Sequence, residues 1–291
     1  MTRYYRIPDD IKHDLVEVTC AVCGGTRART LGYDNGFRIQ KCADPRCGFV
    51  YVNPRPSQQQ LLKLYLDYYP QSDNIPEKWI AEMRDVFTQV ARWLTSRQSR
   101  GRVLDVGCSF GHMLAEMEKR GWQSVGVEPS KTAADYAQKQ LKGAVINRPF
   151  EEAQLERESF DALISLYVLE HVNDPRAFLT KCFELLRFAG QAVIRIPRTE
   201  PLMPVQRLLG RSLMYAPMHL SDFSPRVMQR LCRDIGFRTV EVRVGRARRS
   251  HDLVENAGAL VLGSIGQLVE AVSGGTILFP WTGSLSYHLT K

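Results

Sequence analysis

The sequence predicts an α/β protein in which a doubly wound parallel sheet follows a small cysteine-rich unit. Two observations carry this prediction. From Arg102 onward, short apolar runs alternate with segments of helical periodicity, which is the pattern of strand–helix–strand units. Ahead of them, four of the seven cysteines of the chain fall between residues 20 and 47, a spacing that indicates a metal-stabilised ribbon rather than a strand of the large sheet.

The elements follow from apolar periodicity. Strands are expected at 103–106, 124–127, 144–146, 160–167, 191–196, 237–244 and 284–290. Helices are expected at 58–69, 77–96, 111–121, 130–142, 174–188 and 224–235. The last strand alternates apolar and polar residues, which is typical of an edge strand. We therefore divide the chain into a ribbon (1–52), a helical linker or lid (53–100) and a sheet domain (101–291) with insertions at 198–223 and 245–283.

Composition places the chain among soluble globular proteins. Of its 291 residues, 44% are hydrophobic and 24% charged, which excludes wholesale disorder. The net charge of +8 favours anionic partners without choosing among them. The first residues contain no apolar run of signal-peptide length, so a cytoplasmic location is expected.

The cysteine cluster has the spacing of a zinc site. Cys20 and Cys23 form one C-x-x-C pair, and Cys42 and Cys47 form a C-x4-C pair 18 residues later. Four thiolates satisfy tetrahedral Zn²⁺ and leave no open position, so the ion is expected to be structural. A unit of about 50 residues has little core of its own, and a metal would supply the missing stability. Four buried thiols without a metal are the alternative.

A glycine-containing turn follows the first strand of the large sheet. Gly107-Cys108-Ser109-Phe110-Gly111 joins this strand to a helix, which brings backbone N–H groups close to a ligand. Glu128 ends the next strand, 17 residues beyond Gly111. A carboxylate there can accept both ribose hydroxyls of an adenosine-containing cofactor. The turn does not fit the G-x-G-x-x-G dinucleotide fingerprint.

The turn VLDVGCSFG resembles motif I of class I S-adenosylmethionine-dependent methyltransferases, with Ser109 at the middle glycine. GVEPS, SFDALISLYVLEHVNDP and FLTKCFELLRFAGQAVIRIP resemble later segments of the same family, in the family's order, over about residues 100–244. The resemblance implies a seven-stranded Rossmann-like sheet. The cysteine pairs with GFVYVNPRPS and a Tyr-rich helix resemble bacterial methyltransferases that carry an N-terminal zinc ribbon, several of which act on sugars, glycans or secondary metabolites.

The resemblance also implies which residues contact S-adenosylmethionine. Those expected around the methionine part, the ribose and the adenine are Asp105, Gly107, Cys108, Gly111, Glu128, Phe150, Glu151, Leu166 and Tyr167. The cofactor arrives activated, so the protein mainly aligns the reactants and excludes water. The expected reaction is methyl transfer to a small-molecule or glycan-precursor acceptor, with O-methylation as the favoured chemistry. An RNA methyltransferase whose ribbon grips nucleic acid, and a non-catalytic binding protein of the same fold, are the alternatives.

A hydroxyl acceptor needs a base, and histidine serves at neutral pH. His219 and His171 are the candidates, and for each a hydrogen bond that anchors a loop is the alternative role. Family members with the zinc ribbon often have the motif E-H-x-x-x-F-S at the position of His219. This chain keeps the His and the Phe-Ser but has Met218 in place of the Glu. Glu170-His171 also resembles the metal-binding E-x-x-E-H of quinone-pathway O-methyltransferases, but Tyr167 replaces its first Glu, so we expect no catalytic metal.

Two further segments are candidates for covering or docking roles. Tyr65, Tyr68 and Tyr69 could form a lid over the site or pack on the core. Residues 251–275 follow the basic run GRARRS and place apolar residues on one helical face. Those residues are Val254, Ala257, Val261, Ile265, Leu268 and Val272. Glu255, Glu270 and several glycines argue against a transmembrane span, which leaves a cap, a dimer contact or peripheral contact with a membrane.

Overall fold

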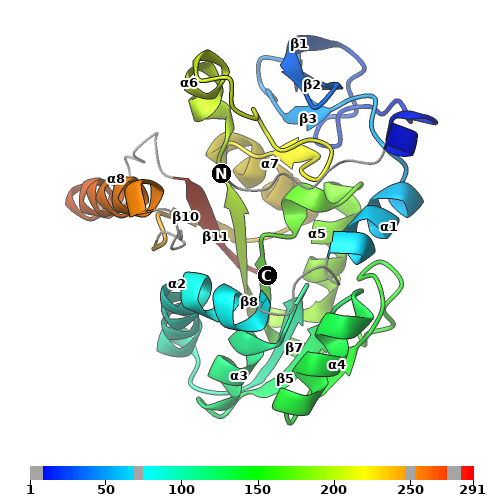
Figure 1. The fold of residues 1–291 in the computed structure, drawn as a ribbon. Coiled ribbons are helices and arrows are strands. Elements are labelled where there is room, and N and C mark those ends of the chain that lie inside the picture. The colour runs from blue at the N-terminus through cyan, green and yellow to red at the C-terminus, as the bar shows by residue number, and fades with distance from the viewer. Residues whose placement is uncertain (1–8, 69–74, 247–252, 274–282) are drawn as a thin grey trace.

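The computed structural model describes residues 9–68, 75–246, 253–273 and 283–291 (Figure 1). Its large sheet has seven strands in the order β10-β11-β8-β7-β4-β5-β6, which confirms the predicted doubly wound fold. The strands are β4 (Arg102–Val106), β5 (Gln123–Val127), β6 (Ala144–Ile146), β7 (Phe160–Leu166), β8 (Leu186–Pro197), β10 (Thr239–Arg243) and β11 (Ser284–Thr290). Five neighbouring strands, β8, β7, β4, β5 and β6, are parallel to one another. β11 runs antiparallel to both of its neighbours, β8 and β10.

Helices cover both faces of this sheet. One face packs against α2 (Ile75–Arg97), α3 (His112–Glu118) and α4 (Lys131–Gln140), and the other against α5 (Pro175–Leu185) and α7 (Pro225–Ile235). Sequence signals place the helix starts. Ser130, Asp174 and Ser224 each cap a helix by accepting a backbone N–H three residues later, and proline follows the last two. The remaining helices are α1 (Gln58–Tyr68), α6 (Met203–Leu208), α8 (Leu253–Val272) and the 3₁₀ turns Asp9–Lys12, Leu169–His171 and Glu200–Leu202.

The last strand does not lie at the edge of the sheet, so the predicted edge position was wrong. β11 lies between β8 and β10, so β10 is the edge strand. The polar residues of β11 are buried because each has a partner on its face of the sheet. Ser286 accepts a hydrogen bond from Arg195, and the His288 ring packs at 4.4 Å from the Trp93 ring of α2. The alternation of polar and apolar residues in β11 therefore reflects different packing partners on the two faces of the sheet, and not exposure of one face to water.

The predicted helix over 174–188 ends earlier than expected. Leu186 pairs with Phe160 of β7, so the backbone turns extended directly after Leu185. The apolar residues at 185 and 186 are compatible with a helix or with a strand. The pairing of Leu186 with β7 is what makes this residue the start of a strand.

A second sheet of four strands has the order β1-β2-β3-β9. Its strands are β1 (Ala28–Asp34), β2 (Phe37–Cys42), β3 (Val50–Val52) and β9 (Ser221–Asp222). The last strand comes from the insertion at 198–223, far along the chain, and the sequence analysis did not anticipate it. The buried Asp34 carboxylate fixes this insertion to the ribbon, because it accepts hydrogen bonds from the Met214 and Ala216 N–H groups and the Ser212 hydroxyl.

Some expectations concern segments at the limits of the structure. Tyr65 is half-buried on α1, whereas Tyr69 lies outside the described residues, and so does part of the 251–275 segment. Among the helices within the described ranges, none combines the length and apolar character that crossing a bilayer requires.

Candidate functional site

The turn after β4 adopts a backbone conformation that favours glycine. Gly107, Ser109 and Gly111 all have positive φ, at 74°, 49° and 78°. A Cβ atom at position 107 would lie 2.5 Å from Cγ2 of Val168, so only glycine fits there. Ser109 thus has a left-handed backbone of the kind that favours glycine, the residue at this position of the resembled motif.

Glu128, at the end of β5, lies directly beneath this turn. Its side chain is fully buried, and its two carboxylate oxygens accept N–H bonds from Ser109 and Ser130, each at 2.9 Å. Burial raises the pKa of Glu128 to about 7, and these two hydrogen bonds only partly offset the effect. A carboxylate has about four lone-pair sites, so two remain for hydroxyl donors of a ligand.

Asp105, on β4, forms an acidic pair with Glu128. The Asp105 side chain is buried, and desolvation together with the charge of Glu128 holds its pKa well above the ordinary value. Two buried carboxyls whose ionisation is disfavoured gain most from a ligand that brings hydroxyl donors or positive charge.

The backbone N–H and carbonyl of Cys108 both form hydrogen bonds within the protein. Its N–H donates to the Val127 carbonyl at 3.1 Å and its own carbonyl accepts from Gly111 at 2.9 Å. Its thiol is buried against Gly126, where a Cβ would lie 2.6 Å from Sγ.

The loop that holds Phe150 and Glu151 is tied to α5 by a lysine that the sequence analysis missed. Lys181 Nζ donates to the carbonyls of Phe150, Glu151 and Ala153 at 2.6, 3.1 and 2.8 Å, and lies 4.8 Å from the centre of the Phe150 ring. Phe150 is buried and the Glu151 side chain is exposed. A lysine among carbonyls leaves no motif in the sequence, so only the tertiary structure reveals this anchor.

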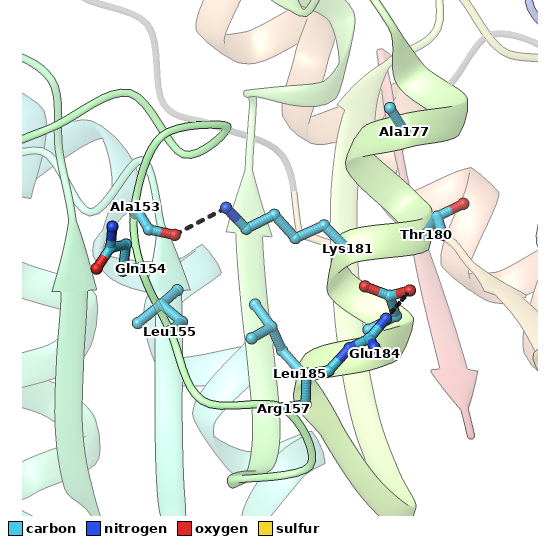
Figure 2. A pocket seen from close by; sticks show the side chains of 9 residues that line it. All are labelled: Ala153, Gln154, Leu155, Arg157, Ala177, Thr180, Lys181, Glu184 and Leu185. Carbon is cyan, nitrogen blue, oxygen red and sulfur yellow. Dashed lines mark hydrogen bonds and ion pairs between the residues drawn. The ribbon is translucent and has the colours of Figure 1, made fainter.

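A cavity of about 560 Å³ opens beside the same lysine (Figure 2). Figure 2 shows Lys181 reaching across to Ala153, and Arg157 paired with Glu184. The lining residues come from the 153–157 segment and from α5, and they include none of the residues predicted to bind cofactor or acceptor. This cavity is therefore separate from the residues predicted to bind cofactor or acceptor.

Leu166 and Tyr167 end β7 next to the glycine turn. Leu166 is buried, and Tyr167 adopts a φ of 60°. The Tyr167 hydroxyl accepts a hydrogen bond from Arg195 Nε at 2.8 Å and lies 3.1 Å from the Ser284 hydroxyl. Arg195 is almost fully buried and also donates to Ser286 and to the Arg246 carbonyl, so it fixes the phenol in place.

The two candidate bases lie side by side, although 47 residues separate them in the sequence. The ring centres of His171 and His219 are 4.8 Å apart. His171 Nδ1 bonds the Met218 carbonyl at 2.7 Å, and the backbone of Met214 lies where it partly offsets the effect of burial on the His219 pKa. Since a carbonyl accepts only from a protonated nitrogen, the neutral His171 ring keeps an unprotonated nitrogen at Nε2. Burial lowers the pKa of both imidazoles, and the His219 value falls well below its usual range.

Glu170 joins this pair. Its carboxyl is buried, neither oxygen has a hydrogen-bond partner among the described residues, and Oε1 lies 4.0 Å from His171 Nε2. Burial raises the pKa of Glu170 to about 8. Ligand atoms of Glu170, His171 and His219 lie within 4.8 Å of one another, so this trio could hold a cation as well as move a proton.

The four predicted zinc ligands converge in the ribbon. Their sulfur atoms all lie within 4.8 Å of one another, with 3.6 Å between Cys20 and Cys47 and 3.5 Å between Cys23 and Cys42. Zn–S bonds of about 2.3 Å in a tetrahedron place sulfur atoms nearly 4 Å apart, on the order of these separations. The donor set and its spacing therefore fit a zinc ion.

The ribbon sheet holds the segment that carries His219. Val50 and Tyr51 of β3 pair with Asp222 and Ser221 of β9, and the Val52 N–H donates to the Leu220 carbonyl at 2.9 Å. The Leu220 N–H in turn donates to the Glu170 carbonyl at 2.7 Å. The ribbon is thus connected through its edge strand to the histidine pair.

Comparison with known proteins gives a consistent result. A family profile described as a methyltransferase domain matches residues 78–242. A ubiquinone biosynthesis O-methyltransferase of Rhodopseudomonas palustris is 31% identical over 97 residues, which cover 32% of this chain and 38% of that protein. One from Cereibacter sphaeroides is 29% identical over 130 residues, covering 42% and 53%. These matches span about half or less of the relatives' length.

Solved structures show the same fold. A SAM-dependent methyltransferase from Thermotoga maritima superposes with a TM-score of 0.53 at 17% identity, over 79% of this chain and 99% of that one. The 1,6-didemethyltoxoflavin-N1-methyltransferase of Burkholderia thailandensis gives 0.55 at 14% identity, over 91% and 99%.

Proposed function

This chain belongs to the S-adenosylmethionine-dependent methyltransferases, and from that premise we propose that it methylates a hydroxyl group of a small-molecule or glycan-precursor acceptor. The observation that carries the proposal is the pairing of His171 with His219, two buried imidazoles whose pKa values are lowered, so that each is neutral and has one unprotonated nitrogen at neutral pH. The names of the O-methyltransferase relatives favour oxygen over nitrogen or carbon as the attacked atom.

The cofactor fits the buried acids below the glycine turn. We assign Glu128 to the ribose hydroxyls, because its carboxylate is desolvated and has lone pairs to spare. Asp105, Gly107, Cys108 and Gly111 would border the methionine part, and Phe150 and Glu151 the adenine. When bound, S-adenosylmethionine supplies a methyl group already activated on a sulfonium. Leu166 and Tyr167 would lie beside it, and the bond from Arg195 keeps the Tyr167 phenol from rotating away.

The histidine pair would remove the acceptor's proton. As the acceptor oxygen attacks, its hydroxyl proton passes to the free ring nitrogen of His219 or His171. On His171, the carbonyl bond to the opposite nitrogen fixes the tautomer and steadies the imidazolium that forms. The ionised form of Glu170, whose Oε1 lies 4.0 Å from His171 Nε2, would compensate that positive charge, and because its pKa is near 8 it reaches this form by releasing its own proton to solvent.

The ribbon would bind one structural zinc ion through Cys20, Cys23, Cys42 and Cys47. We also propose the division into a ribbon (1–52), a helical linker (53–100) and a catalytic domain (101–291). The contacts of β3 with β9 support a role for the ribbon in holding His219, because loss of the ribbon fold would release the segment on which this histidine lies.

A transfer assay tests the proposal. Purified protein is incubated with methyl-tritiated S-adenosylmethionine and a cell extract that is then divided into RNA, glycan and small-metabolite fractions. We expect label in the glycan or metabolite fraction and its loss in His219→Gln or His171→Gln. His13→Gln, at an exposed position, is the matched control and keeps the activity. Label in RNA alone would favour the RNA alternative instead.

A further inference from the structure

The outer face of α8 is apolar, the reverse of what a surface helix normally shows. Val261, Ile265, Leu268 and Val272 are 58, 40, 64 and 81% exposed. At 100° per residue these four side chains fall within an arc of about 60°. Figure 1 shows α8 beside β10, at the edge of the large sheet.

An acidic anchor fixes this orientation. Glu270 lies about 180° around the helix from Val261, and its side chain is buried against the body of the protein. Its Oε2 accepts the Val244 N–H at 2.8 Å, and its Oε1 lies 3.7 Å from Arg243 Nη1. The hydrogen-bonding side of α8 thus faces inward, and the apolar stripe of Val261, Ile265, Leu268 and Val272 faces away from the protein.

The chain that leads into α8 is basic. Among the described side chains of α8, Glu270 is the one charged group, and it is buried. The chain entering the helix reads GRARRS over 245–250, and Arg246 is exposed. An apolar helix face that follows a basic segment of the chain complements the surface of an anionic bilayer, where the stripe would enter the acyl boundary and the exposed Arg246 guanidinium would meet lipid phosphates.

We propose that α8 lies in the surface of an anionic membrane and docks the enzyme there through its apolar stripe. A second copy of the chain fits the same surface less well. Two-fold pairing would bury the apolar stripe, but the described part of the helix would bring no free acid to Arg246, because Glu270 already bonds Val244 and Arg243. The bilayer supplies both the apolar phase and the negative charge.

Flotation of the full-length protein with lipid vesicles tests this. We expect it to float with vesicles of equal parts phosphatidylglycerol and phosphatidylcholine at about 0.05 M salt, and to bind much less at about 0.5 M, where charges are screened. Val261→Glu with Leu268→Glu should weaken binding by about tenfold or more. Replacing Arg246, Arg248 and Arg249 by glutamine should weaken it by about fivefold for each charge removed.

Phe188→Glu is the matched control, since Phe188 is 86% exposed at the start of β8 and should not affect flotation. Each variant should bind S-adenosylhomocysteine like the parent, which shows that it is folded. The proposal is overturned if the parent does not float at low salt, or if the double glutamate variant floats equally well. A dimer in sedimentation that this variant dissociates, with no flotation of either protein, would assign the stripe to a contact between copies.

Discussion

The buried carboxylate of Glu128 accepts a hydrogen bond from the Ser109 N–H at 2.9 Å, so the acid that ends β5 supports the turn that ends β4. The two residues lie on neighbouring parallel strands whose carboxyl ends meet at one edge of the sheet. In the proposed function the same side chain also holds the ribose, so this bond would join cofactor binding to the stability of the turn.

Glu128→Gln should weaken binding of S-adenosylhomocysteine by about 10- to 100-fold, since an amide accepts the ribose hydroxyls less well. It should also change how stability depends on pH. The folded-state pKa is about 7 against 4.5 for an ordinary Glu, so ionisation opposes folding. The parent therefore loses stability relative to the variant as pH rises from about 4.5 to about 7, by roughly 3 kcal/mol at most.

Urea unfolding at several pH values measures this difference, and Glu118→Gln provides a control of opposite sign. Hydrogen bonds from Ser124, Gly143 and Lys142 outweigh desolvation and lower the pKa of Glu118. That parent carboxylate stabilises the fold at neutral pH and loses its contribution as pH falls through the lowered pKa. If both variants responded to pH in the same direction, the assignment of a raised pKa to Glu128 would be incorrect.

Ser109→Gly should stabilise the protein by about 1 kcal/mol and leave or improve cofactor affinity, because glycine adopts a φ of 49° without steric conflict. Thermal unfolding with and without S-adenosylhomocysteine measures both effects. Ser124→Gly on β5 should instead destabilise, since it removes a hydrogen bond to Glu118 from a strand interior. A destabilised Ser109→Gly protein would show that the serine side chain supports the turn.

Removing the catalytic base should lower kcat by about 10²- to 10⁴-fold with little change in cofactor affinity. His219→Gln and His171→Gln are compared under single-turnover conditions once the acceptor is known. Because burial lowers the pKa of both rings, the parent's kcat should stay level as pH falls to about 6.5 and decline only below it. Equal kcat in the parent and both variants would leave the pair a purely structural role.

Catalysis should not depend on a divalent cation. Glu170, His171 and His219 could hold one, but the base mechanism needs a free lone pair on a histidine. We expect added Mg²⁺, Mn²⁺ or Zn²⁺ to leave the rate unchanged or to inhibit it by occupying the pair. Activation by one of these ions, lost in Glu170→Gln, would replace the base mechanism with a metal-assisted one.

The ribbon should contain one zinc ion per chain, and Cys42→Ser should abolish its binding. Zinc content by mass spectrometry and melting temperature are the measurements, and the variant should melt earlier because folding of the ribbon depends on the metal. It should also lose methyl transfer, since β9 and the His219 segment depend on β3. Cys232→Ala, at a buried thiol of α7, keeps the zinc and serves as the control.

The local parts of the fold were predictable because they depend on neighbours in the sequence. Apolar runs, caps at Ser130 and Asp174, and the glycine turn each leave a signal within a few residues. The two residues of β9 carry no such signal, and neither does Lys181, whose three carbonyl partners come from another loop.

By itself the sequence determined the alternation of strands and helices, the cysteine set and the candidates for cofactor and proton transfer, since these are fixed by residue type and spacing. Tertiary structure alone decided that His171 meets His219 beside a buried Glu170, that β11 enters the sheet interior, and that the apolar stripe of α8 faces outward. The physical reason is that packing partners, burial and desolvation depend on residues distant in the chain, and these set both the pKa values and the face that a helix exposes.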